Sequence, residues 1–92
     1  MKKGVDPVLV FWRAFSIFND GSVTEAIREL TRIQERREVQ FAAAVALIYY
    51  HERCRSIDQE TIDTLTIQLD EKESMASDKD LITAATFLWH TQ

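Results

Sequence analysis

The sequence predicts an all-α fold in which antiparallel helical hairpins are stacked. Its 92 residues include only two glycines and one proline, so residues suited to β-hairpin turns are scarce. The unbroken apolar run Phe41–Tyr50 is typical of a helix covered on several sides. Strongly apolar segments also alternate with segments that carry a single apolar stripe. This order is expected when helical hairpins stack into a solenoid.

Local start and stop patterns divide the chain into five helices. Asp6 as N-cap, followed by Pro7 in the first helical position, predicts the first helix. Ser22 and Glu25 have the spacing of a capping box and predict the second. The predicted helices span about residues 7–18, 22–34, 37–53, 58–73 and 78–92.

Two further caps are expected in the second half of the chain. Ser56 with Gln59, or Asp58 alone, would cap the fourth helix. Ser77 or Asp78 would cap the fifth.

The apolar content of the five segments alternates. Val8–Phe18, Phe41–Tyr50 and Leu81–Trp89 are mostly apolar, whereas Val23–Gln34 and Gln59–Lys72 carry one stripe at helical spacing. A striped helix faces water on its other side, and a helix that is apolar all round must be covered. We therefore expect the first, third and fifth helices to be more buried than the second and fourth.

Small residues recur at positions where paired helices approach closely, which favours tetratricopeptide-like repeats. Ala14 and Ala26 take these positions in the first hairpin, Ala46 in the second, and Ala84 or Ala85 in the third. We interpret residues 1–92 as a single helical-repeat segment. It consists of a first hairpin at 6–34, a divergent second hairpin at 37–73 and the first helix of a third at 78–92.

Charge and composition exclude several classes of function. With 11 basic and 15 acidic residues the net charge is −4, and arginines alternate with glutamates, so no nucleic-acid partner is expected. The apolar run Phe41–Tyr50 is too short to span a bilayer, and no direct membrane insertion is expected. The single cysteine, Cys54, is typical of a reducing compartment.

No catalytic, cofactor or metal site is predicted. His51 and Glu52 begin like a zinc-protease motif, but Arg55 stands where the second histidine is required. His51 and Cys54 are one helical turn apart and could supply two zinc ligands, but His90, the other candidate ligand, is distant in sequence. With no nucleophile arrangement or phosphate loop in the sequence, an enzyme is not expected.

Several short blocks of residues share their order and spacing with a known family. The blocks are Asp-Pro-Val at 6–8, Phe11, Ala14, Glu-Ala-Ile-Arg-Glu-Leu at 25–30, Ala-Leu-Ile-Tyr at 46–49, His51, Ile-Asp-Gln-Glu at 57–60 and Phe-Leu-Trp-His at 87–90. Together they resemble the tetratricopeptide repeat protein 21 family, the large repeat subunit of intraflagellar transport complex A. The resemblance covers nearly the whole chain.

The resemblance implies a function in retrograde transport inside cilia and in bringing membrane receptors into them. It implies partners among the other complex subunits, which are repeat and β-propeller proteins. The expected location is the cytoplasmic side of the cilium and basal body, or otherwise the cytoplasm. Because family members are far longer, we expect the chain to be a segment from near their N-terminus, without the helical pair that opens them.

A second hypothesis is an independent cytosolic adaptor that holds peptide segments of partner proteins in a groove. Carboxylate-clamp versions of such a groove need several Lys, Arg or Asn side chains on the first helix of each hairpin. Here those helices offer mainly Arg13. The scaffold hypothesis is therefore favoured.

Apolar residues on the two terminal helices are the candidate partner-binding residues. We expect both helices to lack a covering neighbour, and an uncovered apolar patch usually marks an interface. Self-association of the chain is expected for the same reason. The candidate residues are Phe11, Trp12, Phe15, Leu81, Ala85 and Leu88.

Overall fold

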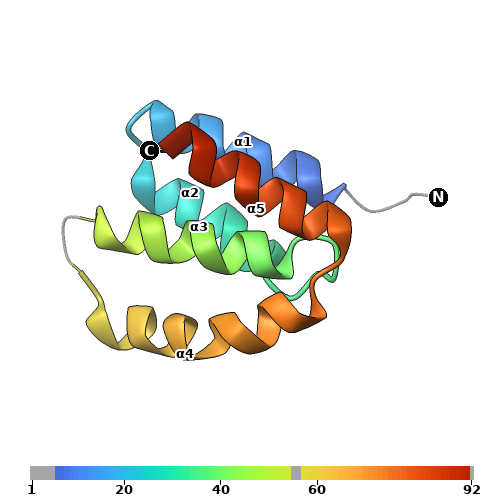
Figure 1. Ribbon diagram of the computed structural model, residues 1–92. Helices are drawn as coiled ribbons and strands as arrows, with labels where there is room; N and C mark the ends of the chain where they lie inside the picture. Colours follow the sequence, from blue (N-terminus) through green and yellow to red (C-terminus); the bar gives the residue numbers. More distant parts are fainter. Residues whose placement is uncertain (1–5, 55–56, 92) are drawn as a thin grey trace.

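The computed structural model describes residues 6–54 and 57–91 (Figure 1). These residues form five α-helices and contain no strand. The helices are α1 Pro7–Asn19, α2 Val23–Ile33, α3 Gln40–Glu52, α4 Gln59–Met75 and α5 Asp78–Thr91. The predicted all-α fold is confirmed, and each helix lies within or close to its expected segment.

Side chains cap α1 and α4 as their sequences predict. The carboxylate of Asp6 accepts a hydrogen bond from the backbone N–H two residues on, at 3.0 Å, and Pro7 opens the helix. The carboxylate of Asp58 accepts from the backbone N–H of Thr61 at 3.2 Å. The alternative cap, Ser56, lies outside the described residues.

The predicted capping box at the start of α2 is wrong, because the turn that ends α1 already uses the backbone N–H of Ser22. Gly21 adopts φ 97°, and its N–H donates to the carbonyl of Phe18. The N–H of Ser22 donates to the carbonyl of Ile17 at 3.1 Å, which completes a Schellman motif. That N–H is then no longer free for the carboxylate of Glu25, and the Ser22 hydroxyl makes no capping bond.

The third helix begins at Gln40, three residues later than the expected start near Arg37. The preceding segment forms turns instead of helix. The N–H of Arg36 donates to the carbonyl of Ile33, and the N–H of Val39 donates to the carbonyl of Arg36. These turns bring the Val39 side chain into the core, where it is fully buried.

The helices alternate in direction, as stacked hairpins do. Helices α1, α3 and α5 run one way, and α2 and α4 run the other (Figure 1). Ala14, Ala26 and Ala46 are fully buried. In α5 it is Ala84 that is buried and Ala85 that is exposed, which decides between the two expected positions.

Helix α3 is the centre of the structure. It packs against α2, α4 and α5. Its predicted burial is confirmed, because more of its residues are buried than in any other helix. The buried residues of α3 are Ala42, Ala43, Ala44, Ala46, Leu47 and Tyr50.

The start of α3 is capped by a carboxylate from another helix. Asp80 of α5 accepts hydrogen bonds from the backbone N–H groups of Phe41, at 2.9 Å, and Ala42, at 2.8 Å. Its own N–H donates to the hydroxyl of Ser77, which confirms one predicted cap of α5. Burial raises the pKa of the Asp80 carboxyl, while the two N–H donors and the charge of nearby Lys72 oppose that shift.

A cluster of aromatic rings joins α1, α3 and α5 around Phe87. Its ring meets those of Phe11 and Phe15 from α1, at centroid distances of 5.7 and 6.0 Å. It also meets Tyr49 and Tyr50 from α3, at 5.5 and 5.7 Å. All four contacts are edge-to-face, the geometry that aromatic pairs favour.

This cluster corrects the expectation that the aromatic residues of the first helix lack a cover. Helix α5 lies beside α1 (Figure 1), and Phe11 is only 1% exposed. Trp12 and Phe15 are half-buried, with the ring of His90 at 6.3 and 5.9 Å. The fifth helix thus covers much of the surface that was predicted to be open.

We expect Asp80→Ala to lower the free energy of unfolding by about 1–3 kcal/mol, because one buried and one partly buried N–H group lose their acceptor. Urea denaturation followed by circular dichroism measures the change. Asp70→Ala, an exposed aspartate on α4, is the control and should stay within about 0.5 kcal/mol of wild type. Equal stabilities of the two variants would show that the Asp80 cap does not support the fold.

We expect Phe87→Leu to lower the free energy of unfolding by about 1–2 kcal/mol, because a smaller side chain leaves space among four rings. Trp89→Leu, on the same helix, makes the same type of change where the side chain is 79% exposed. It should change stability by less than about 0.5 kcal/mol. The same denaturation experiment compares them, and a larger loss for Trp89→Leu would contradict the packing described here.

Candidate functional site

The side of α5 that points away from the core is an uncharged apolar surface. Asp80, Thr83, Ala84 and Phe87 face inward at helical spacing, so the residues between them face outward. No charged side chain occurs from residue 81 to residue 89. We define the α5 outer face as Leu81, Ile82, Ala85, Leu88 and Trp89.

Two residues of this face were missed by sequence reasoning. Ile82 is 65% exposed and Trp89 is 79% exposed, more than Leu81 or Leu88. Helix α5 is apolar on both sides, so periodicity alone does not show which side is covered. Helical spacing is the signal in the sequence that could have found them, because Ile82 and Trp89 stand three and four residues from Ala85, a predicted contact residue.

The six predicted contact residues differ in exposure, and the structure divides them into three groups. Leu81, Ala85 and Leu88 are exposed together on α5. Phe11 is buried under Phe87 and is not accessible to a partner, which corrects its prediction. Trp12 and Phe15 are partly accessible beside it.

A groove lies on α3 between α4 and α5. We define the α4–α5 groove by its lining residues, Val45, Ile48, Tyr49, Glu52, Leu69 and Leu88. Its volume is about 210 Å³. This is below the roughly 300–1,000 Å³ of small-molecule sites. Through Leu88 the groove is continuous with the α5 outer face, so protein side chains are the better candidates to fill it.

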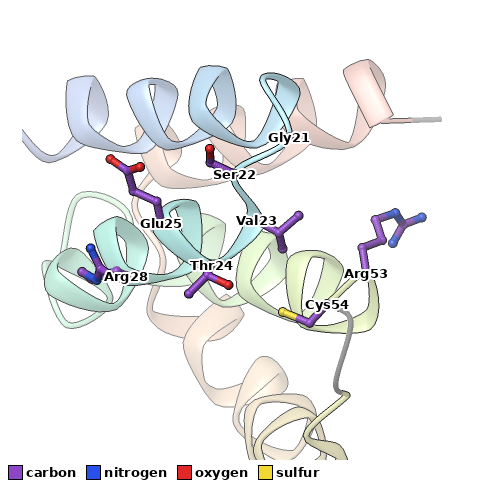
Figure 2. A pocket seen from close by; sticks show the side chains of 8 residues that line it. All are labelled: Gly21, Ser22, Val23, Thr24, Glu25, Arg28, Arg53 and Cys54. Carbon is purple, nitrogen blue, oxygen red and sulfur yellow. The ribbon is translucent and has the colours of Figure 1, made fainter.

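A wider, polar cleft at the start of α2 does not form a ligand site. It has a volume of about 640 Å³ and includes Arg28, Arg53 and Cys54 (Figure 2). The two arginines lie at opposite ends of the cleft, so they do not converge on one point. The Arg53 guanidinium also lies over the Tyr49 ring at 3.5 Å and donates to the Tyr49 carbonyl.

Metal and membrane sites find no support in the described residues. His51 and Cys54 are both half-buried near the end of α3. Across 6–54 and 57–91, no group of three potential metal ligands comes together. The helices in these ranges are too short or too polar to cross a membrane.

Comparison with known proteins identifies relatives of the chain. Residues 1–92 match the family described as tetratricopeptide repeat protein 21 N-terminal ARM repeat. Tetratricopeptide repeat protein 21A of Homo sapiens is 37% identical over 84 residues, which are 91% of this chain and 6% of that protein. Tetratricopeptide repeat protein 21B is 34% identical over 87 residues in Homo sapiens and 35% identical over 91 residues in Mus musculus. These alignments cover 95% and 98% of this chain, and 7% of each of those proteins.

We expect the chain to self-associate at low micromolar concentration, because the α5 outer face is a continuous apolar surface. Sedimentation velocity measures this. Ile82→Asp with Trp89→Asp should give a monomer, whereas Ile67→Asp, on the exposed side of α4, should behave as wild type. A wild-type chain that remains monomeric would show that this face does not pair with itself.

Proposed function

Because this chain belongs to the tetratricopeptide repeat protein 21 family, we propose that it is a protein-binding scaffold segment of intraflagellar transport complex A. Its function is then in retrograde transport inside cilia and in the trafficking of ciliary membrane proteins. Its partners are other subunits of the complex, among them repeat and β-propeller proteins. Its location is the cytoplasmic side of the cilium and basal body.

The observation that carries the proposal is the α5 outer face. It presents Ile82 and Trp89 on a helix that Asp80 and Phe87 hold against α3. A rigid apolar surface of this kind binds a partner with little loss of side-chain freedom. Exposed tryptophan is also among the residues that contribute most to protein interfaces. Binding, not catalysis, is what this surface can do.

The cytosolic adaptor hypothesis receives less support. A carboxylate clamp needs several cationic side chains free to meet a peptide. Arg13, the main candidate, donates to the carboxylate of Glu29 on α2 at 3.4 Å. Arg32 pairs with the same carboxylate at 3.3 Å, so the charges on this side of the molecule largely satisfy one another.

We expect the tagged chain, expressed in ciliated cells, to concentrate at the basal body and cilium and to co-purify subunits of the transport complex. Ile82→Asp with Trp89→Asp should abolish both results, because charges then stand in the apolar contact surface. Quantitative mass spectrometry and fluorescence microscopy measure the outcome. Ile67→Asp serves as the matched control and should retain both.

The proposal is wrong if the wild-type chain co-purifies none of these subunits. It is also wrong if the α5 double variant co-purifies them as well as wild type does. Circular dichroism of each variant checks that its helices are intact, so that loss of binding is not loss of fold.

A further inference from the structure

Helix α4 is held in the structure by fewer neighbours than the other helices. Helices α1 and α2 pack on each other, both α2 and α5 pack on α3, and the ring of Phe87 joins α5 to α1. Each of these four helices therefore contacts at least two others. Helix α4 packs mainly on α3 and lies at the edge of the molecule, with α3 between it and α1 (Figure 1).

The apolar contact that holds α4 is small. In its 17 residues the buried apolar side chains are Ile62 and Leu65, and both belong to its first half. Leu69, in the second half, is only half-buried. Helix α4 also has no aromatic residue, so it takes no part in the cluster of rings around Phe87. Its second half therefore has little apolar surface with which to hold α3.

Polar contacts do not make up for this small apolar contact. Among residues 6–54 and 57–91, no side-chain hydrogen bond or ion pair joins α4 to another helix. The hydroxyls of Thr64 and Thr66 donate to carbonyls one turn earlier in α4 itself, and Gln59 donates to Asp63. Docking of α4 on α3 thus depends on the packing of Ile62 and Leu65.

One side chain of α4 opposes this docking. Lys72 continues the stripe of Leu65 and Leu69 at helical spacing, and it is only 9% exposed. Its ammonium has no hydrogen-bond partner among the described residues. The Asp80 carboxylate attracts the ammonium but forms no hydrogen bond with it, and it already accepts two from α3. Burial of a charge without hydrogen bonds is unfavourable, so the ammonium regains its hydration when α4 leaves α3.

These observations assign α4 a conformational role. We propose that α4 is a displaceable helix: it detaches from α3 while the other four helices stay folded, and burial of the Lys72 ammonium keeps the free energy of this opening low. Proteins open locally in cooperative units, and elements with few buried apolar contacts open first. Detachment removes Leu69 from the α4–α5 groove and uncovers the side of α3 beneath α4. The inference goes beyond the proposed function, because it concerns the chain alone and is measured without a partner.

Hydrogen exchange of the backbone amides, followed by NMR on the full chain, tests the proposal. After correction for intrinsic rates, we expect the slowest amides of α4 to exchange at least about tenfold faster than the slowest amides of α3 and α5. Low concentrations of urea should accelerate exchange in α3 and α5 strongly and in α4 only weakly, because detachment exposes much less surface than global unfolding. The chain with Ile82→Asp and Trp89→Asp should give the same order, which excludes an effect of self-association through α5.

Variants of α4 test what sets the opening. Lys72→Met removes the buried charge and keeps a side chain of similar length, so it should slow exchange of the α4 amides about tenfold. Lys79→Met makes the same change at an exposed lysine of α5 and should leave exchange in α4 unchanged. Leu65→Ala should accelerate exchange in α4 at least about tenfold, because it removes apolar packing on α3.

Phe87→Leu distinguishes local opening from global unfolding. It weakens the cluster of rings on α5, which stays intact when α4 detaches. It should therefore accelerate exchange in α3 and α5 severalfold and leave α4 unchanged. Equal acceleration in all three helices would show that α4 opens only when the whole chain unfolds, and it would overturn the inference.

The remaining outcomes are equally decisive. Amides of α4 that exchange as slowly as those of α3, or with the same dependence on urea, contradict the proposal. So does a Lys72→Met chain whose α4 amides do not exchange more slowly than wild type, since the ammonium would then not oppose docking. None of these measurements uses co-purification of transport-complex subunits. Failure here leaves the proposed function standing, and failure to co-purify leaves this inference standing.

Discussion

Two hydrogen bonds from the start of α3 to the carboxylate of Asp80 link the parts of this structure. A helix begins with backbone N–H groups that have no partner within the helix, and α3 begins inside the molecule with an apolar sequence. Asp80 supplies the acceptor from α5, 38 and 39 residues away in sequence. The positive end of the α3 dipole favours a carboxylate there. The same contact sets where α5 begins relative to α3.

Once α5 is placed in this way, Phe87 falls among the rings of α1 and α3. The contacts of α5 with α3 and α1 then add to those between α1 and α2, α2 and α3, and α3 and α4. Lys72 is drawn into the interior beside Asp80, and its ammonium has no hydrogen-bond partner among the described residues. The charged side chains that α4 presents to solvent are therefore acidic.

The same arrangement decides which apolar residues remain for a partner. By packing on α1 and α3, α5 covers Phe11 and exposes Ile82 and Trp89. It also stands apart from α4 across α3, which opens the groove lined by Ile48 and Leu88. The outer face and the groove meet at Leu88 and form one continuous surface.

The sequence by itself determined the five helices, the burial of α3 and the family. These depend on local patterns: the cap at Asp6, the spacing of apolar residues in α2, and the alanines of α3. One local pattern gave a wrong prediction: Ser22 has the spacing of a capping box, but its N–H donates to the carbonyl of Ile17 in the turn that ends α1. The tertiary structure alone decided that Asp80 caps α3, that Phe87 covers Phe11 and that Trp89 is exposed. Each of these depends on contacts between residues far apart in the chain, and a helix that is apolar on both sides does not specify in its sequence which side its neighbours will cover.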